Sequence, residues 1–200
     1  AGTAHISGRA YREAAAPLQE VGAHLDARVA HPGRSARNTL LALAQEMRKL
    51  GKVSILAPDR NWSGGGHVKT LDRALRVKEY RLADGSTAFA SDGAPSDCVS
   101  LGILGYFKEK IDLVVSGINV GANLGHDVTY SGTVTAAMES VIMGVPAVAV
   151  SLEVLENHLG EMDFQPAALA ARKVMERVLE GGLAPEILLE NGFVRPIRRR

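Results

Sequence analysis

Short apolar segments alternate along this chain with longer segments of helical spacing, and no other feature of the sequence constrains the fold as strongly. Most of the short segments are apolar at successive positions, which is typical of strands buried on both faces. A chain that alternates such strands with helices forms a largely parallel sheet covered by helices, which is an α/β fold. The expected strands are residues 53–57, 73–82, 88–90, 111–115, 146–151 and 187–189, and the expected helices are residues 40–50, 95–107, 133–143 and 165–179.

The two ends of the chain differ in composition from its middle. Residues 1–40 hold 10 Ala and 4 Gly without a regular apolar period. We therefore expect an atypical N-terminal segment there, for which disorder is one interpretation. Residues 41–189 carry the alternating pattern and form the expected domain. Residues 190–200 end in three Arg and are expected to be a basic, solvated tail.

Composition and charge exclude several classes of protein. Apolar residues make up 46% of the chain, which is enough for a buried core, and the single Cys excludes an intrachain disulfide. The net charge is +1, and the Arg residues gather near the two ends rather than on a folded face, so we expect no nucleic-acid polymer as a partner. The longest uncharged apolar run, Val145–Leu152, is too short to cross a bilayer. These features predict a soluble, cytoplasmic protein with no membrane partner.

Three loops rich in Gly and small polar residues follow expected strands, where parallel sheets bind their ligands. In the first loop, Gly64 to Gly66 leave backbone N–H groups free to turn toward an anion, and Ser63 can offer its hydroxyl to a phosphate or a metal. The second loop, Ser116 to Gly132, holds Asn119 and Asn123, whose amide oxygens suit Mg²⁺, Mn²⁺ or Ca²⁺. Alternatively, these loops are ordinary turns stabilised by their own side chains.

The third segment, Ser131-Gly132-Thr133, begins an expected helix of small residues. Its first N–H groups and the helix dipole would favour an anion, although a Ser at this position also serves simply as a helix cap. Cys98 lies on an expected apolar helix and is interpreted as a buried structural thiol. His126 is interpreted as a surface loop residue, and Trp62 either stacks on a base or covers its own loop.

Four segments together resemble the SurE family of 5′/3′-nucleotidases, over about three quarters of the chain. They are PDRNWSGGG (58–66), SDGAPSDCV (91–99), SGINVGANLGHDVTYSGTVTAAME (116–139) and GVPAVAVSL (144–152). The resemblance implies a Rossmann-like three-layer sandwich with a mostly parallel sheet. It also implies metal-dependent removal of phosphate from nucleoside 5′- or 3′-monophosphates, with Mg²⁺ or Mn²⁺, by a homo-oligomeric enzyme.

The resemblance also implies roles for individual residues. Ser63 and Asn119 match metal ligands of the family. The positions that match its phosphate- and substrate-binding surface are Gly64, Gly65, Asn123, Ser131, Gly132 and Thr133.

One part of the family pattern is absent from this sequence. The family's two adjacent Asp, which follow its first strand, have no counterpart: the acids before Thr39 are Glu13, Glu20 and Asp26, and none adjoins another acid. The catalytic carboxylates therefore stay unassigned. An alternative function is a catalytically impaired remnant that binds phosphate or nucleotide. A dinucleotide-dependent oxidoreductase is disfavoured because no glycine fingerprint joins a first strand to a helix.

Overall fold

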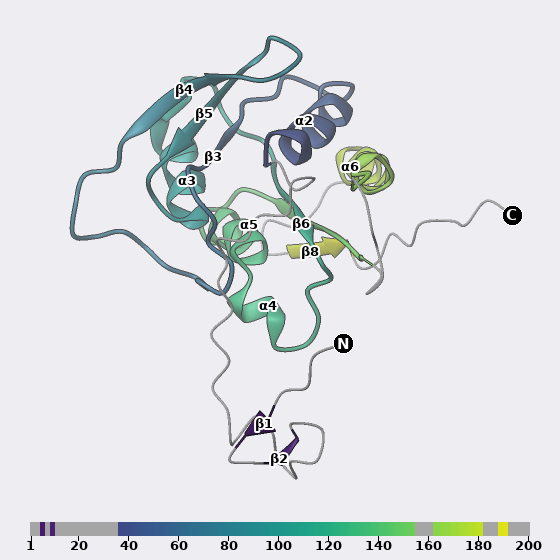
Figure 1. The fold of residues 1–200 in the computed structure, drawn as a ribbon. Coiled ribbons are helices and arrows are strands. Elements are labelled where there is room, and N and C mark those ends of the chain that lie inside the picture. Colours follow the sequence, from purple (N-terminus) through teal and green to yellow (C-terminus); the bar gives the residue numbers. More distant parts are fainter. Residues whose placement is uncertain (1–4, 7–8, 11–35, 155–161, 182–187, 192–200) are drawn as a thin grey trace, which may run out of the picture.

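Two separate three-stranded sheets form the centre of the molecule (Figure 1). The structure is a computed structural model that describes residues 5–6, 9–10, 36–154, 162–181 and 188–191. The first sheet has the order β3-β5-β4 and the second the order β6-β7-β8, and all neighbours are parallel except β4 and β5. The strands are β3 (Leu56–Pro58), β4 (Val77–Arg81), β5 (Thr87–Ser91), β6 (Val114–Val120), β7 (Ala147–Leu152) and β8 (Leu188–Asn191). A short antiparallel ladder joins β1 (His5–Ile6) to β2 (Arg9–Ala10).

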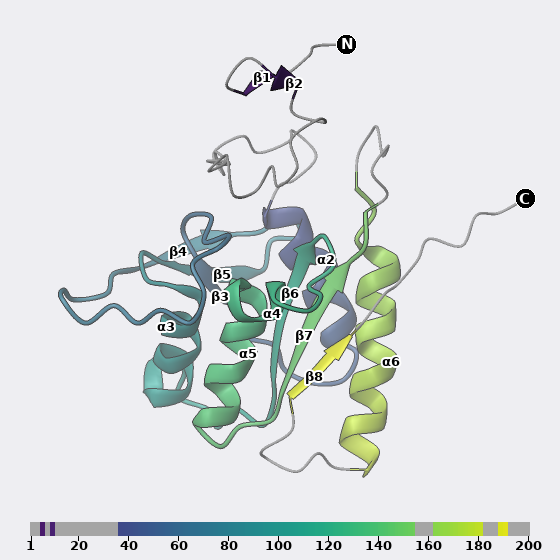
Figure 2. The same ribbon diagram turned by 90° about the horizontal axis from the view of Figure 1, so that it is seen from below.

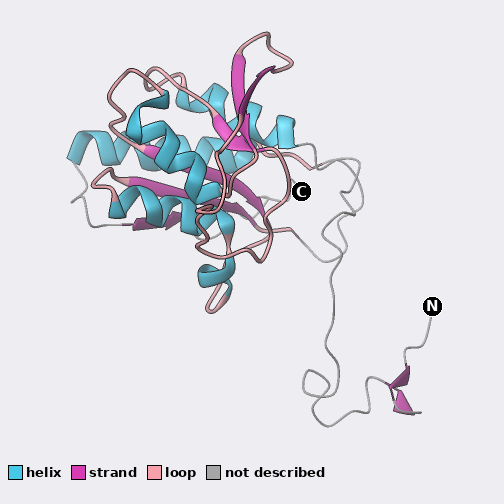
Figure 3. Ribbon diagram, turned by 90° about the vertical axis from the view of Figure 1, so that its left-hand side faces the viewer, coloured by secondary structure: helices cyan, strands magenta, loops and turns pink. Residues whose placement is uncertain are grey.

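Helices cover the second sheet on both faces, which makes three layers (Figures 2 and 3). Strand β7 shows why: Val148 and Val150 pack in a cluster with α2 and α6, whereas Ala147 and Ala149 pack in another with α5. Because side chains alternate along a strand, a strand such as β7, with apolar side chains on both faces, needs a helix on each side. The helices are α2 (Ala36–Met47), α3 (Pro95–Leu101) with its π-helical extension η2 (Gly102–Tyr106), α4 (Asp127–Tyr130), α5 (Gly132–Ile142) and α6 (Gln165–Gly181).

The predicted three-layer α/β fold is confirmed, and the main difference concerns the second sheet's first strand. The apolar run 111–115 predicted a strand there, followed by a loop from Ser116. In the structure β6 runs from Val114 to Val120, so Asn119 lies within a strand. Pairing with β7 sets these limits, because Val114 lies opposite Ala147 and Val120 opposite Leu152. The predicted loop also contains the short helix α4.

Smaller differences occur at other element ends. The helix expected over 40–50 begins at Ala36 and ends at Met47. The strand expected over 53–57 is β3, shifted to Leu56–Pro58. A hairpin turn at Asp84-Gly85 joins β4 to β5, with Leu82 N donating to Ser86 O across the turn. Most of residues 1–40, and residues 192–200, lie outside the described residues, so the predicted domain limits stay a prediction.

Helices α2 and α6 are joined by a buried carboxylate. Glu46, 2% exposed, accepts hydrogen bonds from the Arg172 Nε (2.9 Å) and from the Gln165 amide (2.9 Å), both on α6. Lys49 Nζ lies 2.6 Å from the same carboxylate. The Lys49 hydrogen bond and those from Arg172 and Gln165 outweigh the effect of burial, so the pKa of Glu46 is below its usual value. Within the described part of the chain, no helix combines the length and apolar character that a bilayer crossing requires.

Candidate active site

The loop after β3 is a tight turn built around one asparagine side chain. Asn61 Oδ1 accepts hydrogen bonds from both the backbone N (2.8 Å) and the Oγ (2.7 Å) of Ser63. The turn closes when Gly65 N donates to Trp62 O at 3.0 Å. Gly64 and Gly66 have φ of +74° and +63°, a left-handed conformation that favours glycine. The sequence Asn-Trp-Ser-Gly-Gly-Gly therefore folds locally into a tight glycine loop. The expectation that Gly64 to Gly66 all leave their N–H groups free for an anion is wrong for Gly65 and Gly66, because these two N–H groups donate to the carbonyls of Trp62 and Tyr130.

This glycine loop lies directly against the start of helix α5. Gly66 N donates to Tyr130 O at 3.0 Å, and Gly66 O lies 3.2 Å from Thr135 Oγ1, whose nearest acceptor is Ser131 O at 2.8 Å. A Cβ added at Gly132 would lie 3.6 Å from Trp62 O and 3.0 Å from the Pro95 ring, so only glycine fits here without displacement. The structure thus brings together the two segments that the sequence suggested as anion sites.

Helix α5 begins with the cap that the sequence predicted. Ser131 has extended backbone angles, and its Oγ accepts a hydrogen bond from Val134 N at 3.3 Å. The N–H groups of the first turn have no partner inside a helix, and the helix dipole makes this end favourable for an anion. Because α5 is 11 residues long, it supplies a full dipole behind Gly132 and Thr133. The cap and the anion site are compatible roles of the same turn.

Asn119 and Asn123 converge on β7 through Ser151. Asn119 lies opposite Ser151 in the β6–β7 register, and the buried Asn123 donates from Nδ2 to Ser151 Oγ at 2.8 Å. Asn119 turns its own Nδ2 toward the backbone carbonyls of Val120 (3.4 Å) and Gly121 (2.8 Å). Its Oδ1 is therefore the atom turned away from these carbonyls. Asn119 lies in the carboxyl half of β6 and Asn123 follows the strand, on the side where the chain leads through α4 into α5.

Comparison with known proteins decides the family. The model of the family "Survival protein SurE" matches residues 33–192. The chain belongs to the SurE family. A protein named 5'-nucleotidase SurE from Herpetosiphon aurantiacus is 52% identical over 150 residues, and one from Chloroflexus aggregans is 51% identical over 150 residues. In both cases the match covers 75% of this chain and 58% of the relative, so this SurE-family chain spans less than two thirds of their length.

A solved structure supports the same conclusion for the fold. The crystal structure of the SurE protein from Aquifex aeolicus matches this chain with a TM-score of 0.66 and 38% sequence identity. The match covers 79% of this chain and 60% of the other. The family resemblance predicted from the four sequence segments is thus confirmed.

The metal site that the SurE resemblance implies is only partly provided by the described residues. Ser63 Oγ and Asn119 Oδ1 are neutral oxygens, and hard dications also need carboxylate charge. The described residues contain no group of three or more His, Cys, Asp or Glu side chains that could hold a metal ion. On their own, therefore, they do not fit a divalent cation.

Sequence reasoning missed a buried carboxylate that anchors the glycine loop. Glu139 on α5 is 6% exposed and lies 2.8 Å from the His67 Nε2 and 2.6 Å from the Lys69 Nζ. Ser100 Oγ of α3 donates to the same carboxylate at 2.8 Å. Burial raises the pKa of Glu139, but the hydrogen bonds from Lys69, Ser100 and His67 outweigh it, and the net pKa is below its usual value. The only local signal was an acid within a helix of small residues.

A second buried carboxylate holds the next part of the same segment. Asp97, near the start of α3, accepts hydrogen bonds from the backbone N (3.1 Å) and the hydroxyl (2.7 Å) of Thr70. It also accepts from Ala94 N at 2.8 Å. Residues 67–70 are therefore fastened to both α3 and α5, which fixes the glycine loop that precedes them.

The remaining residues that the sequence singled out are Cys98, Trp62 and His126. Cys98 is 4% exposed, as predicted for a structural thiol, and burial together with the nearby charge of Asp97 raises its pKa to about 12. Arg60 places its guanidinium 5.6 Å from the centre of the Trp62 ring. The Trp62 Nε1 is buried and has no hydrogen-bond partner among the described residues. His126 is exposed at the start of α4, as expected for a surface loop residue.

Proposed function

We propose that this chain binds nucleoside monophosphates and hydrolyses their 5′- or 3′-phosphate, as a phosphomonoesterase. The observation that carries the proposal is the direct contact between the glycine loop and the start of α5, through Gly66, Tyr130 and Thr135. The N–H groups at the start of α5 and the N–H of Gly64 next to them match the several oxygens of one phosphate. The name 5'-nucleotidase, given to relatives about half identical to this chain, agrees with that chemistry.

In the proposed site each segment has its own task. The N–H groups of Gly132 and Thr133, together with the α5 dipole, bind phosphate oxygens on one side. The N–H of Gly64 binds them on the other, and Gly65 lines the same side without its N–H, which donates to Trp62 O. The Ser131 hydroxyl stays near both. Because these donors are fixed before substrate arrives, they stabilise the negative charge of a phosphoryl group without rearrangement.

We also propose that hydrolysis requires a divalent cation, Mg²⁺ or Mn²⁺, which would supply charge neutralisation when bound. Ser63 and Asn119 are the neutral ligands that we assign to it, and Asn123 is assigned to the substrate side. The carboxylates such an ion requires are not gathered among the described residues. We further propose that the enzyme is homo-oligomeric and cytoplasmic. Neither a nucleic-acid polymer nor a membrane is its partner in this proposal.

Phosphate release from 5′-AMP and 3′-AMP by the full chain tests the proposed activity. The arms contain Mg²⁺, Mn²⁺ or EDTA, and calorimetric titration with AMP runs in parallel. We expect release with a metal and none with EDTA. Binding of AMP without release under any metal would overturn hydrolysis in favour of the impaired, nucleotide-binding alternative. The absence of both binding and release would overturn the site itself.

A further inference from the structure

The proposed phosphate site is built from two separate elements, and helix α5 holds both of them. The first turn of α5 carries the N–H groups of Gly132 and Thr133. Further along the same helix lies Glu139, whose Oε2 is 2.8 Å from the His67 Nε2. At 1.5 Å per residue, this contact lies about 10 Å along the helix from the phosphate site. His67 directly follows Gly66, so the end of the glycine loop is bound to the helix that carries the other donors.

The two oxygens of the Glu139 carboxylate have different partners. Oε1 lies 2.6 Å from the Lys69 Nζ and accepts a hydrogen bond from the Ser100 Oγ of α3 at 2.8 Å. Oε2 is the oxygen that faces His67. Because a carboxylate only accepts hydrogen bonds, Nε2 is the ring nitrogen that carries the proton in this pair. A hydrogen bond to an ionised acceptor is stronger than one between neutral groups, so the contact can hold the chain firmly.

The position of Gly64 depends on the two ends of the glycine loop. A Cβ built at Gly64 would meet no described atom within 4 Å beyond its chain neighbours, so packing in the described part of the chain does not fix this residue. The first end of the loop is held by Asn61, which accepts two hydrogen bonds from Ser63. The last end is held by Gly66, whose N donates to a carbonyl just before α5, and by the side chain of His67.

Residues beyond His67 have anchors of their own on α3. Thr70 Oγ1 donates to Asp97 at 2.7 Å, and Val68 O accepts from the Ser96 Oγ. Loss of the His67 contact would therefore leave residues 68–70 in place and loosen the part of the chain next to the glycines. This makes His67 the side chain of the 67–70 segment that bears most directly on the loop.

We propose that His67 is a positioning residue for the phosphate site, which aligns the Gly64 N–H with the first turn of α5 through its hydrogen bond to Glu139. This inference rests on the proposed function, because the phosphate site is part of that function. His67 does not contact the phosphate in this arrangement and acts through the backbone of the loop. A displacement of about 1 Å in a positioned site can lower its efficiency by about 100-fold, so loss of the contact should affect binding as well as stability.

Variants of His67 in the full chain test the assignment. His67→Ala should raise the Kd for inorganic phosphate and for AMP by about 10-fold or more, measured by calorimetry. His67→Gln offers an amide N–H to Glu139 in place of the imidazole, and it should restore both Kd values to within about 3-fold of the wild type. If His67→Ala does not fold by circular dichroism, His67→Leu replaces it, because leucine keeps the bulk without an N–H donor.

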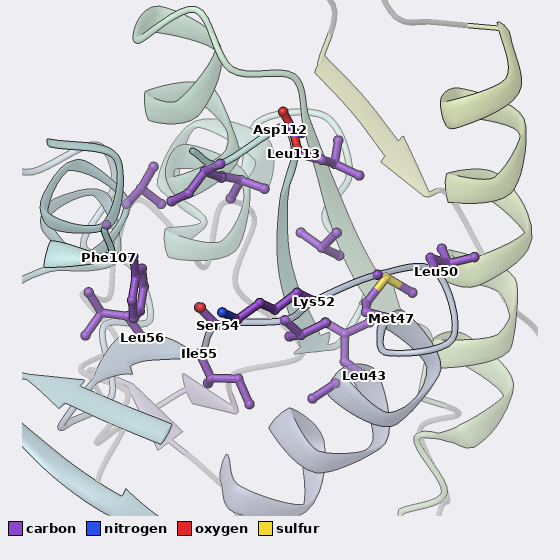
Figure 4. A pocket seen from close by; sticks show the side chains of 18 of the residues that line it. Leu43, Met47, Leu50, Lys52, Ser54, Ile55, Leu56, Phe107, Asp112 and Leu113 are labelled. Carbon is purple, nitrogen blue, oxygen red and sulfur yellow. The ribbon is translucent and has the colours of Figure 1, made fainter. Parts of the chain in front are cut away.

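Two controls separate positioning from a general loss of stability. Ser100→Ala removes another hydrogen bond from the same carboxylate, but one that comes from α3 rather than from the loop. Leu50→Ala removes packing at a cavity of about 530 Å³ whose lining includes neither His67 nor Glu139 (Figure 4). Both controls should lower the unfolding free energy and leave both Kd values within about 3-fold of the wild type.

The only Trp of the chain reports on the loop in the absence of a ligand. Trp62 lies in the glycine loop, where its O accepts a hydrogen bond from Gly65 N at 3.0 Å. Acrylamide should quench Trp62 fluorescence about 2-fold more efficiently in His67→Ala than in the wild type, because a loosened loop opens more often to the quencher. His67→Gln and Ser100→Ala should be quenched like the wild type.

The outcomes distinguish this inference from the proposed function. If the wild type binds phosphate and AMP, unchanged Kd values in His67→Ala would overturn this inference alone. Equal losses of affinity in the two controls, a lack of rescue in His67→Gln, or unchanged quenching in His67→Ala would do the same. A wild-type chain that binds neither phosphate nor AMP would overturn the proposed function and this inference with it.

Discussion

Asn119 and Asn123, four positions apart, use the same amide group for different purposes. Asn123 is buried and spends its Nδ2 on Ser151, a contact that ties the loop to β7. Asn119 fixes its Nδ2 on two neighbouring carbonyls and so holds its Oδ1 in one orientation. A fixed orientation without deep burial is what a ligand-binding side chain requires.

The two asparagines should therefore respond differently to replacement by alanine. We expect Asn119→Ala to lower kcat/KM for AMP by about 100-fold or more, as loss of a positioned contact does, with little change in stability. Asn123→Ala should cost about 1–3 kcal/mol of unfolding free energy, because it leaves Ser151 without its partner. Steady-state kinetics and urea unfolding measure the two effects. An unchanged rate in Asn119→Ala would remove it from the site.

Cys98 gives a prediction about reactivity. With a pKa raised to about 12, roughly one thiol in ten thousand is ionised at pH 8, and the sulfur is also buried. Native protein should therefore react with dithionitrobenzoate far more slowly than protein unfolded in guanidinium. The thiol titre over time in the two conditions is the measurement, and rapid labelling of native protein would contradict it.

At the scale of single elements, helix α5 combines a stabilising cap with the proposed phosphate site. Ser131→Ala removes the acceptor for Val134 N and should lower the unfolding free energy by about 0.5–2 kcal/mol. We also expect it to weaken binding of inorganic phosphate. Ser140→Ala is the matched control: Ser140 donates to Val145 O near the other end of α5 and should alter stability alone. Equal phosphate affinity in the two variants would show that Ser131 caps the helix without contributing to phosphate binding.

Local pattern predicted most elements but not their limits or partners. The cap at Ser131 and the small-residue helix after it were readable because both signals lie within a few positions. The extension of β6 to Val120 could not be predicted from local sequence, because the end of the strand depends on pairing with β7, about thirty residues later. Likewise, the contact of Glu139 with His67 joins positions 72 apart, and no local spacing encodes it. The adjacency of the glycine loop and α5 was predictable only because both follow the carboxyl ends of strands.

At the scale of the whole molecule, acid should destabilise the fold through two buried carboxylates. Glu46 and Glu139 have pKa values below the usual 4.5 because each is hydrogen-bonded to cations. In the unfolded chain both bind protons near that usual value. Their contribution is therefore complete above about pH 5 and is lost as pH falls through the lower, folded pKa.

We expect the unfolding free energy to drop steeply between about pH 5 and pH 3. Glu139→Gln should reduce that slope and lower stability at pH 7, whereas Glu79→Gln, at an exposed position on β4, should do neither. Urea unfolding at a series of pH values provides the comparison. Stability that stays constant or rises on acidification would show that these carboxylates are not the groups responsible.

The buried Glu46 carboxylate that joins α2 to α6 also affects when the core can form during synthesis of the chain. Glu46 is synthesised 119 residues before Gln165 and 126 before Arg172. At roughly 5–20 residues per second, α6 leaves the ribosome about 6–25 seconds after α2. Throughout that interval the core face of α2 has no α6 to pack against, and Glu46 has Lys49 as its nearest cation. The nascent chain therefore cannot complete this part of its core until α6 emerges to pack against α2.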